Sequence, residues 1–124
     1  MRCPCRKKSE VRSYDDCCQP HHVGAFAAPT AEALMRSRYT AFALRDAQYL
    51  RATWHRTTRP EPVDFAPGQH WLLLRVLATT TDDDRATVEF VARSRIDGKI
   101  HELHETSRFV REDGCWLYVD GVVA

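Results

Sequence analysis

Residues 86–98 have the sequence ATVEFVARSRIDG, and this stretch decides the fold class. Small and apolar side chains alternate with polar ones, as they do in a strand with one buried and one solvated face. One face carries Ala86, Val88, Phe90, Ala92 and Ile96, and the other carries Thr87, Glu89, Arg93 and Arg95. The dipeptide Asp97-Gly98 is typical of a two-residue hairpin turn. The stretch therefore predicts a strand over 86–96 that turns back into an antiparallel neighbour.

The segments on either side continue this pattern. Residues 71–80 and 99–111 are rich in β-branched and aromatic side chains, and a last apolar segment spans Cys115 to Gly121. Turn-forming residues separate these segments at 81–84 and at 112–114. Four consecutive strands joined by short turns predict an antiparallel meander.

The part of the chain before residue 59 has the spacing of helices instead. Thr30 is suited to cap a helix over 31–44, in which apolar residues recur at intervals of three and four: Leu34, Met35, Tyr39, Phe42 and Ala43. Asp46 is expected to cap a second helix that carries Tyr49, Leu50 and Trp54. The prolines between Arg59 and Gly68 end helical structure. We therefore predict an α+β fold, with helices packed on one face of a curved antiparallel sheet of about four strands.

Four of the five cysteines lie near the start of the chain: Cys3, Cys5, Cys17 and Cys18. A Cys-x-Cys turn aims two sulfurs at one point, and an adjacent pair returned by a short loop completes the tetrahedron that zinc takes with thiolates. Four thiolates leave no open coordination position, so we expect a structural zinc. Disulfides are disfavoured, because adjacent cysteines bond only with strain and no signal peptide is recognisable.

Two alternatives remain for the fourth ligand, since His21 and His22 follow the last cysteine closely. We expect both to be solvated turn histidines instead. Cys115 is expected to be a buried or half-buried strand residue. Residues 1–24 are short of aliphatic side chains and should depend on metal to fold, whereas residues 25–124 should carry their own core.

The overall charge favours no particular partner. Eighteen Lys and Arg residues against 17 Asp and Glu give a net charge of +1, and no apolar run approaches the roughly 20 residues of a spanning helix. We expect a soluble, cytoplasmic protein without membrane or nucleic-acid partners. The first 12 residues are locally basic, with Arg2, Arg6, Lys7, Lys8 and Arg12 against Glu10. These cations are expected to offset the negative charge of a zinc tetrathiolate.

A set of motifs covers most of the chain: Cys3-Pro4-Cys5, Cys17-Cys18, residues 28–42, Thr53-Trp54-His55, residues 103–109, Asp113-Gly114, Trp116 and Asp120-Gly121. Together they resemble the YchJ-like family of small bacterial proteins. The resemblance implies an N-terminal SEC-C motif, a zinc-binding element, in residues 1–24. It also implies a nuclear-transport-factor-2-like α+β cone in residues 25–124. The loop over residues 6–16 is longer than is usual in SEC-C motifs.

Any further chemistry is expected in a pocket of the cone. Glu105 and Ser107 share a strand face with two large apolar residues, and Tyr39, Trp54 and His55 are expected to border the same pocket. Glu105 could serve there as a base, but we favour an ion pair between Glu105 and Arg36 or Arg38 that ties strand to helix. His104 should face away from Ser107, which argues against a nucleophilic serine.

Three functions are consistent with these features. The favoured one is a zinc-binding module for a protein or small-molecule ligand, without a catalytic residue. The first alternative is a dehydratase- or isomerase-like enzyme that uses the pocket carboxylate, and the second is ribosome or nucleic-acid association through the basic loop. A homodimer through the outer sheet face is expected from the charges of Arg93 and Arg95 opposite Glu89.

Overall fold

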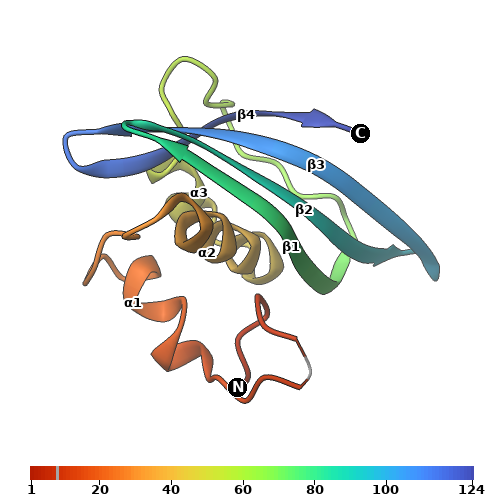
Figure 1. The fold of residues 1–124 in the computed structure, drawn as a ribbon. Helices are drawn as coiled ribbons and strands as arrows, with labels where there is room; N and C mark the ends of the chain where they lie inside the picture. The colour runs from red at the N-terminus through yellow and green to blue at the C-terminus, as the bar shows by residue number, and fades with distance from the viewer. Residues whose placement is uncertain (8) are drawn as a thin grey trace.

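The computed structural model describes residues 1–7 and 9–124 and has three layers (Figure 1). The N-terminal element, residues 1–24, contains a 3-10 turn (Tyr14–Asp16) and helix α1 (Gln19–His22). Helices α2 (Ala31–Leu44) and α3 (Ala47–Ala52) follow. The strands are β1 (His70–Asp82), β2 (Arg85–Ile96), β3 (Lys99–Glu112) and β4 (Cys115–Val123). Helix α2 lies between the sheet and the N-terminal element.

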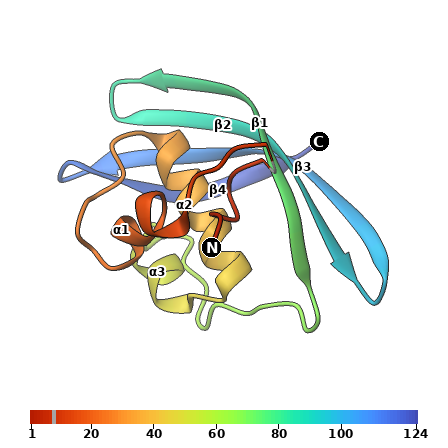
Figure 2. The ribbon, with the colours of Figure 1, turned by 90° about the horizontal axis from the view of Figure 1, so that it is seen from below.

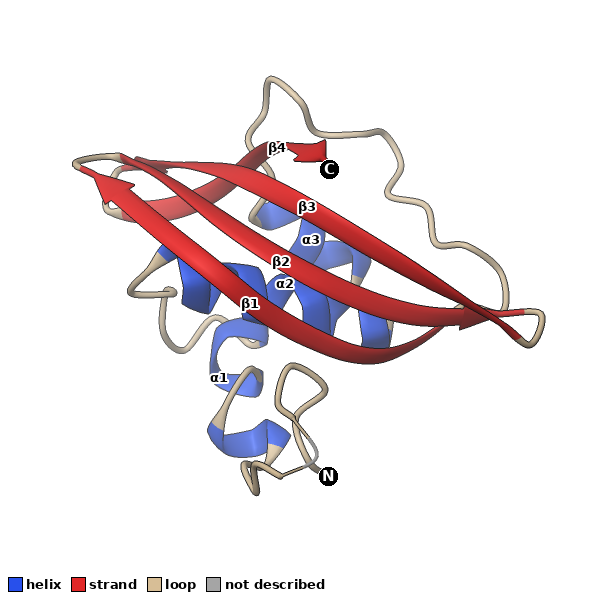
Figure 3. Ribbon diagram, turned by 45° about the vertical axis from the view of Figure 1, so that its right-hand side comes forward, coloured by secondary structure: helices blue, strands red, loops and turns tan. Residues whose placement is uncertain are grey.

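The sheet has the predicted meander topology, with antiparallel strands in the order β1-β2-β3-β4 (Figure 3). The inward face of β2 carries the buried residues Ala86, Val88, Phe90, Ala92 and Ser94. Asp97 and Gly98 both have positive φ, as a two-residue primed turn requires. Irregularities in the β1–β2 and β3–β4 registers bend the strands around the helices. The predicted α+β class is confirmed.

The helix α2 begins and ends where local chemistry requires. The Ala33 N–H donates to Thr30 Oγ1 at 3.0 Å, which satisfies one free amide of the first turn. Arg45 ends the helix in the left-handed conformation, with φ of 58°. Asp46 then accepts from the Tyr49 N–H and starts α3, as predicted.

The prediction that Trp54 belongs to the second helix is wrong. Helix α3 ends at Ala52, and residues 53–55 run alongside β4 instead. The Tyr118 N–H donates to the Thr53 carbonyl at 2.9 Å, and the His55 N–H donates to the Tyr118 carbonyl at 2.8 Å. This pairing satisfies backbone groups at the free edge of β4, and it is therefore favoured over continuation of the helix.

The core crosses all three layers. One cluster joins Leu34 of α2 to Val88 and Phe109 of the sheet, and it includes the buried residues Cys3, Cys5 and Cys18. A second cluster lies between α2, α3 and the loop before β1: Ala41, Tyr49, Leu50 and Val63. Figure 2 shows the N-terminal segment and the helices together in front of one face of the sheet.

Several strand limits differ from the predictions. Strand β1 continues to Asp82, so the turn is Asp83-Asp84, and β4 continues to Val123. Cross-strand pairing extends β1 beyond its apolar residues, and it continues β4 past Gly121 through Val122 and Val123. The expectation for Cys115 is also wrong, because its side chain is exposed at the start of β4. None of the helices in the described residues has the length and apolar character needed to cross a bilayer.

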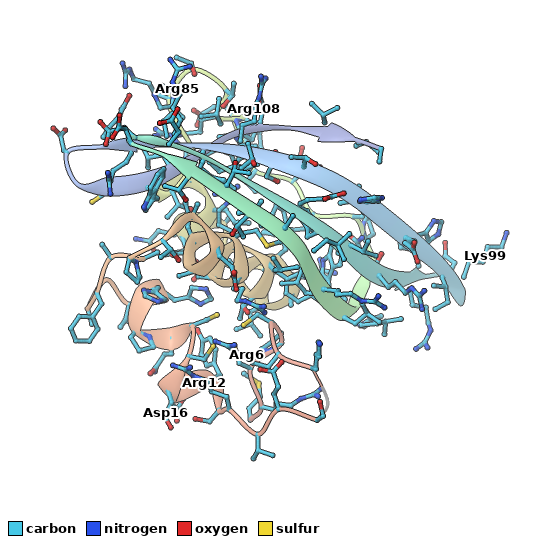
Figure 4. The ribbon with its side chains drawn as sticks, in the orientation of Figure 1. Arg6, Arg12, Asp16, Arg85, Lys99 and Arg108 are labelled. Atoms are coloured by element: carbon cyan, nitrogen blue, oxygen red, sulfur yellow. The ribbon has the colours of Figure 1, made fainter. Side chains whose placement is uncertain are left out.

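The outer sheet face pairs its charges within the chain. Arg93 Nε donates to Glu102 Oε2 at 2.8 Å, and His104 Nε2 lies 2.7 Å from Glu89 Oε2. Arg108, labelled on this face in Figure 4, pairs with Asp120. Because Glu89 and Arg93 are already paired, they offer little for a self-complementary contact. The homodimer therefore stays a prediction, and the charges of Glu89 and Arg93 no longer support it.

Two leucines of α2 offer a matched test of this packing. Leu34 is 1% exposed and Leu44 is 41% exposed, and both substitutions to alanine change helix propensity equally. We expect Leu34→Ala to lower the free energy of unfolding by about 3 kcal/mol, because it leaves a cavity in the core. Leu44→Ala should cost less than about 1 kcal/mol. Urea denaturation followed by circular dichroism measures both, and equal losses would contradict the packing described.

Candidate functional site

The four N-terminal cysteines converge on one point. Their sulfur atoms all lie within 4.8 Å of one another, although 11 residues separate the two pairs in the chain. The first pair sits on a tight turn in which the Arg6 N–H donates to the Cys3 carbonyl at 3.1 Å. The second pair ends the 3-10 turn and begins α1. The antiparallel bridge between Arg2 and Ser13 holds the two strands of the loop together.

The sulfur separations fit a tetrahedral zinc ion. Zn–S bonds of about 2.3 Å in a tetrahedron place the sulfurs about 3.8 Å apart. The Cys5 sulfur lies 3.7 Å from Cys3, 3.6 Å from Cys17 and 3.7 Å from Cys18. The Cys17 and Cys18 sulfurs are 4.0 Å apart. The cluster can therefore bind a metal ion, and its four thiol donors are of the kind that zinc prefers.

Two neighbours of the cluster, Arg6 and Thr40, favour negative charge on its sulfurs, whereas burial opposes it. Arg6 Nε donates to Cys17 Sγ at 3.4 Å, and this hydrogen bond is the main reason why the pKa of Arg6 is raised. Thr40 Oγ1 of helix α2 lies 3.6 Å from Cys3 Sγ. The pKa of the Cys18 thiol is raised by its contacts with Cys3 and Cys5 and by burial. A dication among the sulfurs reverses that balance and favours thiolates.

Neither histidine belongs to the cluster, and the prediction of a solvated turn residue is wrong for His22. The His22 side chain is 3% exposed. Its Nε2 lies 2.8 Å from the Ser37 carbonyl and must donate there, so Nδ1 accepts from the Tyr14 hydroxyl at 2.7 Å. His21 is more exposed, with Nδ1 2.8 Å from the Phe26 carbonyl. His22 therefore docks the N-terminal element onto α2.

The basic loop is engaged in local contacts. Figure 4 shows Arg6 and Arg12 in the N-terminal element, and Arg12 donates to the Asp16 carbonyl at 2.9 Å and 3.2 Å. Arg6 also pairs with Glu10 at 3.5 Å. These contacts agree with the expectation that the cations support the cysteine cluster. Lys8 lies outside the described residues.

A cavity of about 250 Å³ lies between α2 and the inner face of the sheet. Its walls are mostly aromatic and aliphatic, and four of the five predicted pocket residues line it: Tyr39, Trp54, Glu105 and Ser107. The remaining lining residues are Met35, Arg38, Phe42, Trp71, Phe90, Ala92, Leu103, Phe109 and Tyr118. Such apolar walls with a few polar groups are typical of small-molecule sites.

Glu105 is held on the cavity wall by β3 and β4. Ser107 Oγ donates to Glu105 Oε2 at 2.7 Å. Gly121 of β4 leaves the space for this carboxylate, because a Cβ there would come within 2.1 Å of Oε2. His104 faces the other side of the strand, as predicted, and binds Glu89.

The predicted ion pair between Glu105 and Arg36 or Arg38 is wrong. Arg36 points toward the N-terminal element, where it donates to the Cys5 carbonyl at 2.8 Å and to Glu32 at 3.0 Å. Arg38 Nη1 donates to the Leu50 carbonyl at 2.9 Å and to Thr53 Oγ1 at 2.8 Å. Each arginine is drawn to carbonyl oxygens left free near a turn or a helix end. The Glu105 carboxylate consequently faces the cavity without a cation partner among the described residues.

His55 is the predicted pocket residue that does not line the cavity. The pairing of residues 53–55 with β4 places its ring away from the cavity, where Nε2 lies 2.9 Å from Glu112 Oε2 and Nδ1 lies 2.7 Å from Thr57 Oγ1. The hydrogen bond from His55 lowers the pKa of Glu112. His55 cannot act as an acid toward a ligand that Glu105 contacts.

Arg38 is the main cavity residue that the sequence interpretation missed. It is 5% exposed, and its Cζ lies 4.7 Å and 4.6 Å from the ring centroids of Trp54 and Tyr118. A signal was present in the sequence, because Arg38 follows Leu34 by four residues and so lies on the apolar stripe of the helix. Tyr118 was missed because its strand partner, residues 53–55, was expected to be helical.

Comparisons with known proteins agree with this architecture. The model of the YchJ middle NTF2-like domain matches residues 30–121. A UPF0225 protein of Polaromonas naphthalenivorans is 50% identical, with 96% of this chain and 95% of the relative covered. A UPF0225 protein of Streptomyces coelicolor is 48% identical, with 96% of this chain and 93% of the relative covered.

Two solved structures share the whole fold. The solution structure of a SEC-C motif containing protein from Rhodopseudomonas palustris has a TM-score of 0.85 and 35% identity, and covers 100% of this chain and 99% of that one. The crystal structure of a SEC-C motif containing protein from Psychrobacter arcticus has a TM-score of 0.80 and 32% identity, and covers 98% of this chain and 82% of that one. Both are similar over the cysteine cluster and the cone alike.

Proposed function

The chain belongs to the YchJ-like family of UPF0225 proteins, and we propose that it is a zinc-stabilised binding module for a small organic molecule. Zinc bound by Cys3, Cys5, Cys17 and Cys18 fixes the N-terminal element on helix α2. The cavity on the other side of α2 binds the ligand. In this proposal residues 1–24 form the zinc-binding part and residues 25–124 the ligand-binding part.

The observation that carries the proposal is the shared helix. Thr40 and Arg36 of α2 contact the cysteine turn, whereas Tyr39 and Phe42, one to three positions away, line the cavity. A metal site on one face of a helix restrains the side chains on its other face, because both are fixed to one rigid backbone. Zinc therefore has a structural role that includes the cavity wall. The SEC-C descriptions of the two similar structures support the choice of zinc.

The ribosome or nucleic-acid alternative has less support. Arg6 and Arg12 are engaged by Cys17, Glu10 and the Asp16 carbonyl, so the loop offers fewer free cations than its sequence suggests. Phosphate contacts depend on such free cations.

The zinc site has a direct test. We expect one zinc ion per chain, and a cobalt-substituted protein should show the intense visible absorption of a tetrahedral thiolate site. Cys17→Ser should lose most of the metal affinity because it removes a ligand. Cys115→Ser is the matched control and should keep it, since the exposed Cys115 lies outside the cluster. Full zinc affinity in Cys17→Ser would overturn the assignment of ligands.

The cavity can be tested with indole, a neutral probe of suitable size. We expect indole to shift the NMR signals of Trp71 and Phe90, and Ala92→Leu to weaken its binding about tenfold or more because leucine fills the cavity. Ala86→Leu is the control, since Ala86 is also buried on the inner face of β2 but does not line this cavity. Chelation of zinc should weaken indole binding as well. Equal binding by the two variants would contradict the proposed site.

An enzyme of the dehydratase or isomerase kind is a second candidate, favoured by the placement of Glu105. Its carboxylate lines the cavity, bound to Ser107 and free of arginine. Two phenols line the same space, the buried Tyr39 and the half-buried Tyr118, and partial burial raises the pKa of Tyr118 to about 12. A carboxylate base and a protonated phenol are a workable pair for proton abstraction.

The enzyme candidate predicts deuterium uptake. A bacterial metabolite extract incubated in D₂O with the wild-type protein should contain a compound that gains deuterium or changes by one water. Glu105→Gln should abolish this change while indole still binds, because only the base is removed. Glu102→Gln, on the outer face of the same strand, should leave it intact. If no compound changes in the wild-type sample, the binding function stands alone.

A further inference from the structure

A buried cation without an acidic partner lines the cavity. Arg38 is 5% exposed, and among the described residues no carboxylate pairs with it. Within the part of the chain that the structure describes, only its Nη1 has hydrogen-bond partners, the Leu50 carbonyl and Thr53 Oγ1, and both are neutral. Nε and Nη2 carry three further N–H groups. The guanidinium thus keeps unused donors beside the cavity.

The aromatic rings around Arg38 compensate its charge only in part. Its Cζ lies within 4.7 Å of the Trp54 ring centroid and 4.6 Å of the Tyr118 ring centroid, the geometry of cation–π contacts. Burial nevertheless lowers the pKa of Arg38 to about 10. A buried ion costs several kcal/mol unless an opposite charge balances it, so an apolar residue would serve the fold at least as well. An uncompensated charge at a cavity wall is typical of a binding site.

The second charged group of the cavity lies at a different place on the sheet. Arg38 stacks on Tyr118, which pairs with Phe109 of β3, whereas Glu105 lies opposite Val123. Phe109 lies four positions along β3 from Glu105, so their Cα atoms are about 13 Å apart at about 3.3 Å per residue. Tyr118 lies between the two charges. Its pKa is raised mainly by burial, and it is raised further by Glu105 and lowered by Arg38. The cavity therefore has a cationic end and an anionic end.

The volume limits the occupant. Liquid water takes about 30 Å³ per molecule, so a cavity of 250 Å³ has room for about eight waters, or on the order of ten non-hydrogen atoms of a ligand. Aromatic rings make up much of the cavity wall, including Tyr39, Trp71 and Phe90. Rings favour a flat apolar body that can stack against them.

We infer that the cavity binds a small organic acid with a flat apolar body, whose carboxylate faces Arg38 and whose opposite end offers a hydroxyl or amine donor to Glu105. The orientation follows from charge, because a carboxylate at the other end would be repelled by Glu105. A carboxylate matches the single cation of the cavity better than a phosphate ester does, because the second negative charge of a dianion would lack a partner in apolar surroundings. The inference rests on the proposed function and specifies its ligand class.

Three probes of similar size separate the contribution of the ligand's carboxylate from that of its hydroxyl group in the wild-type, zinc-loaded protein. 4-Hydroxybenzoate has both polar ends, 4-hydroxybenzamide lacks the charge, and benzoate lacks the hydroxyl donor. Calorimetric titration should show that the amide binds about tenfold or more weakly than 4-hydroxybenzoate, because a charge-assisted hydrogen bond to Arg38 is lost. Benzoate should bind a few-fold more weakly. The Arg38 Nε–H signal in ¹⁵N spectra should shift with the two acids only.

Two variants assign the effect to Arg38. Arg38→Met should abolish the preference for the acid over the amide. Arg93→Met removes a cation from the outer face of the sheet and should keep that preference. If Arg38→Met does not fold, the three-probe comparison and the Nε–H signal in the wild-type protein still decide the question.

The outcomes separate the two proposals. Equal affinity for the acid and the amide overturns the inference, and indole binding then preserves the cavity function. Loss of the preference in Arg93→Met also overturns it. If neither indole nor any of the three probes binds, the proposed function fails together with the inference.

Discussion

The constraint on which the rest of the structure depends is that helix α2 is packed on two sides. One side contacts strands β1, β2 and β4, and the other contacts α1 and the cysteine turn. A helix with two packed sides needs small or apolar residues around most of its surface, and α2 buries Ala31, Leu34, Met35, Ser37, Arg38, Tyr39, Thr40 and Ala41. The residues on α2 that are polar and buried are therefore committed to specific partners.

This constraint explains why the N-terminal element needs a cross-link. Its largest contributions to the core are Cys3, Cys5 and Cys18, which are too small to supply much hydrophobic stabilisation on their own. A metal ion held by the four cysteines would cross-link this segment. Hydrogen bonds that involve His22, Arg36 and Thr40 attach the segment to the helix. The N-terminal element and the cone consequently share one continuous core, although their compositions differ.

The same constraint leaves the cavity open. The curved sheet faces α2 across this space, and the side chains between them do not fill it. The cavity is partly open to solvent, and apolar clefts with a few polar groups are the usual binding sites of small molecules. The wall of this cavity carries the buried charge of Arg38, whose pKa is lowered by burial, and the carboxylate of Glu105, which accepts a hydrogen bond from Ser107.

Local patterns in the sequence determined the elements and the metal cluster. The alternation over 86–96, the Asp-Gly turns and the caps at Thr30 and Asp46 act within a few residues, and their geometry survives in any tertiary context. The spacing of the four cysteines is equally local. Limits such as the end of β1 at Asp82 were missed because cross-strand pairing, and not side-chain type, extends a strand.

Only the tertiary structure decided which polar side chains share a site. Arg38 donates to the Leu50 carbonyl at the end of α3, whereas Ser107 and the space left by Gly121 hold Glu105 elsewhere on the cavity wall. His55 does not line the cavity because residues 53–55 pair with the edge of β4. His22 became buried because Tyr14 and Ser37 satisfied both of its nitrogens. Each outcome is a competition among partners distant in sequence, and a local pattern contains no information about which partner is nearest.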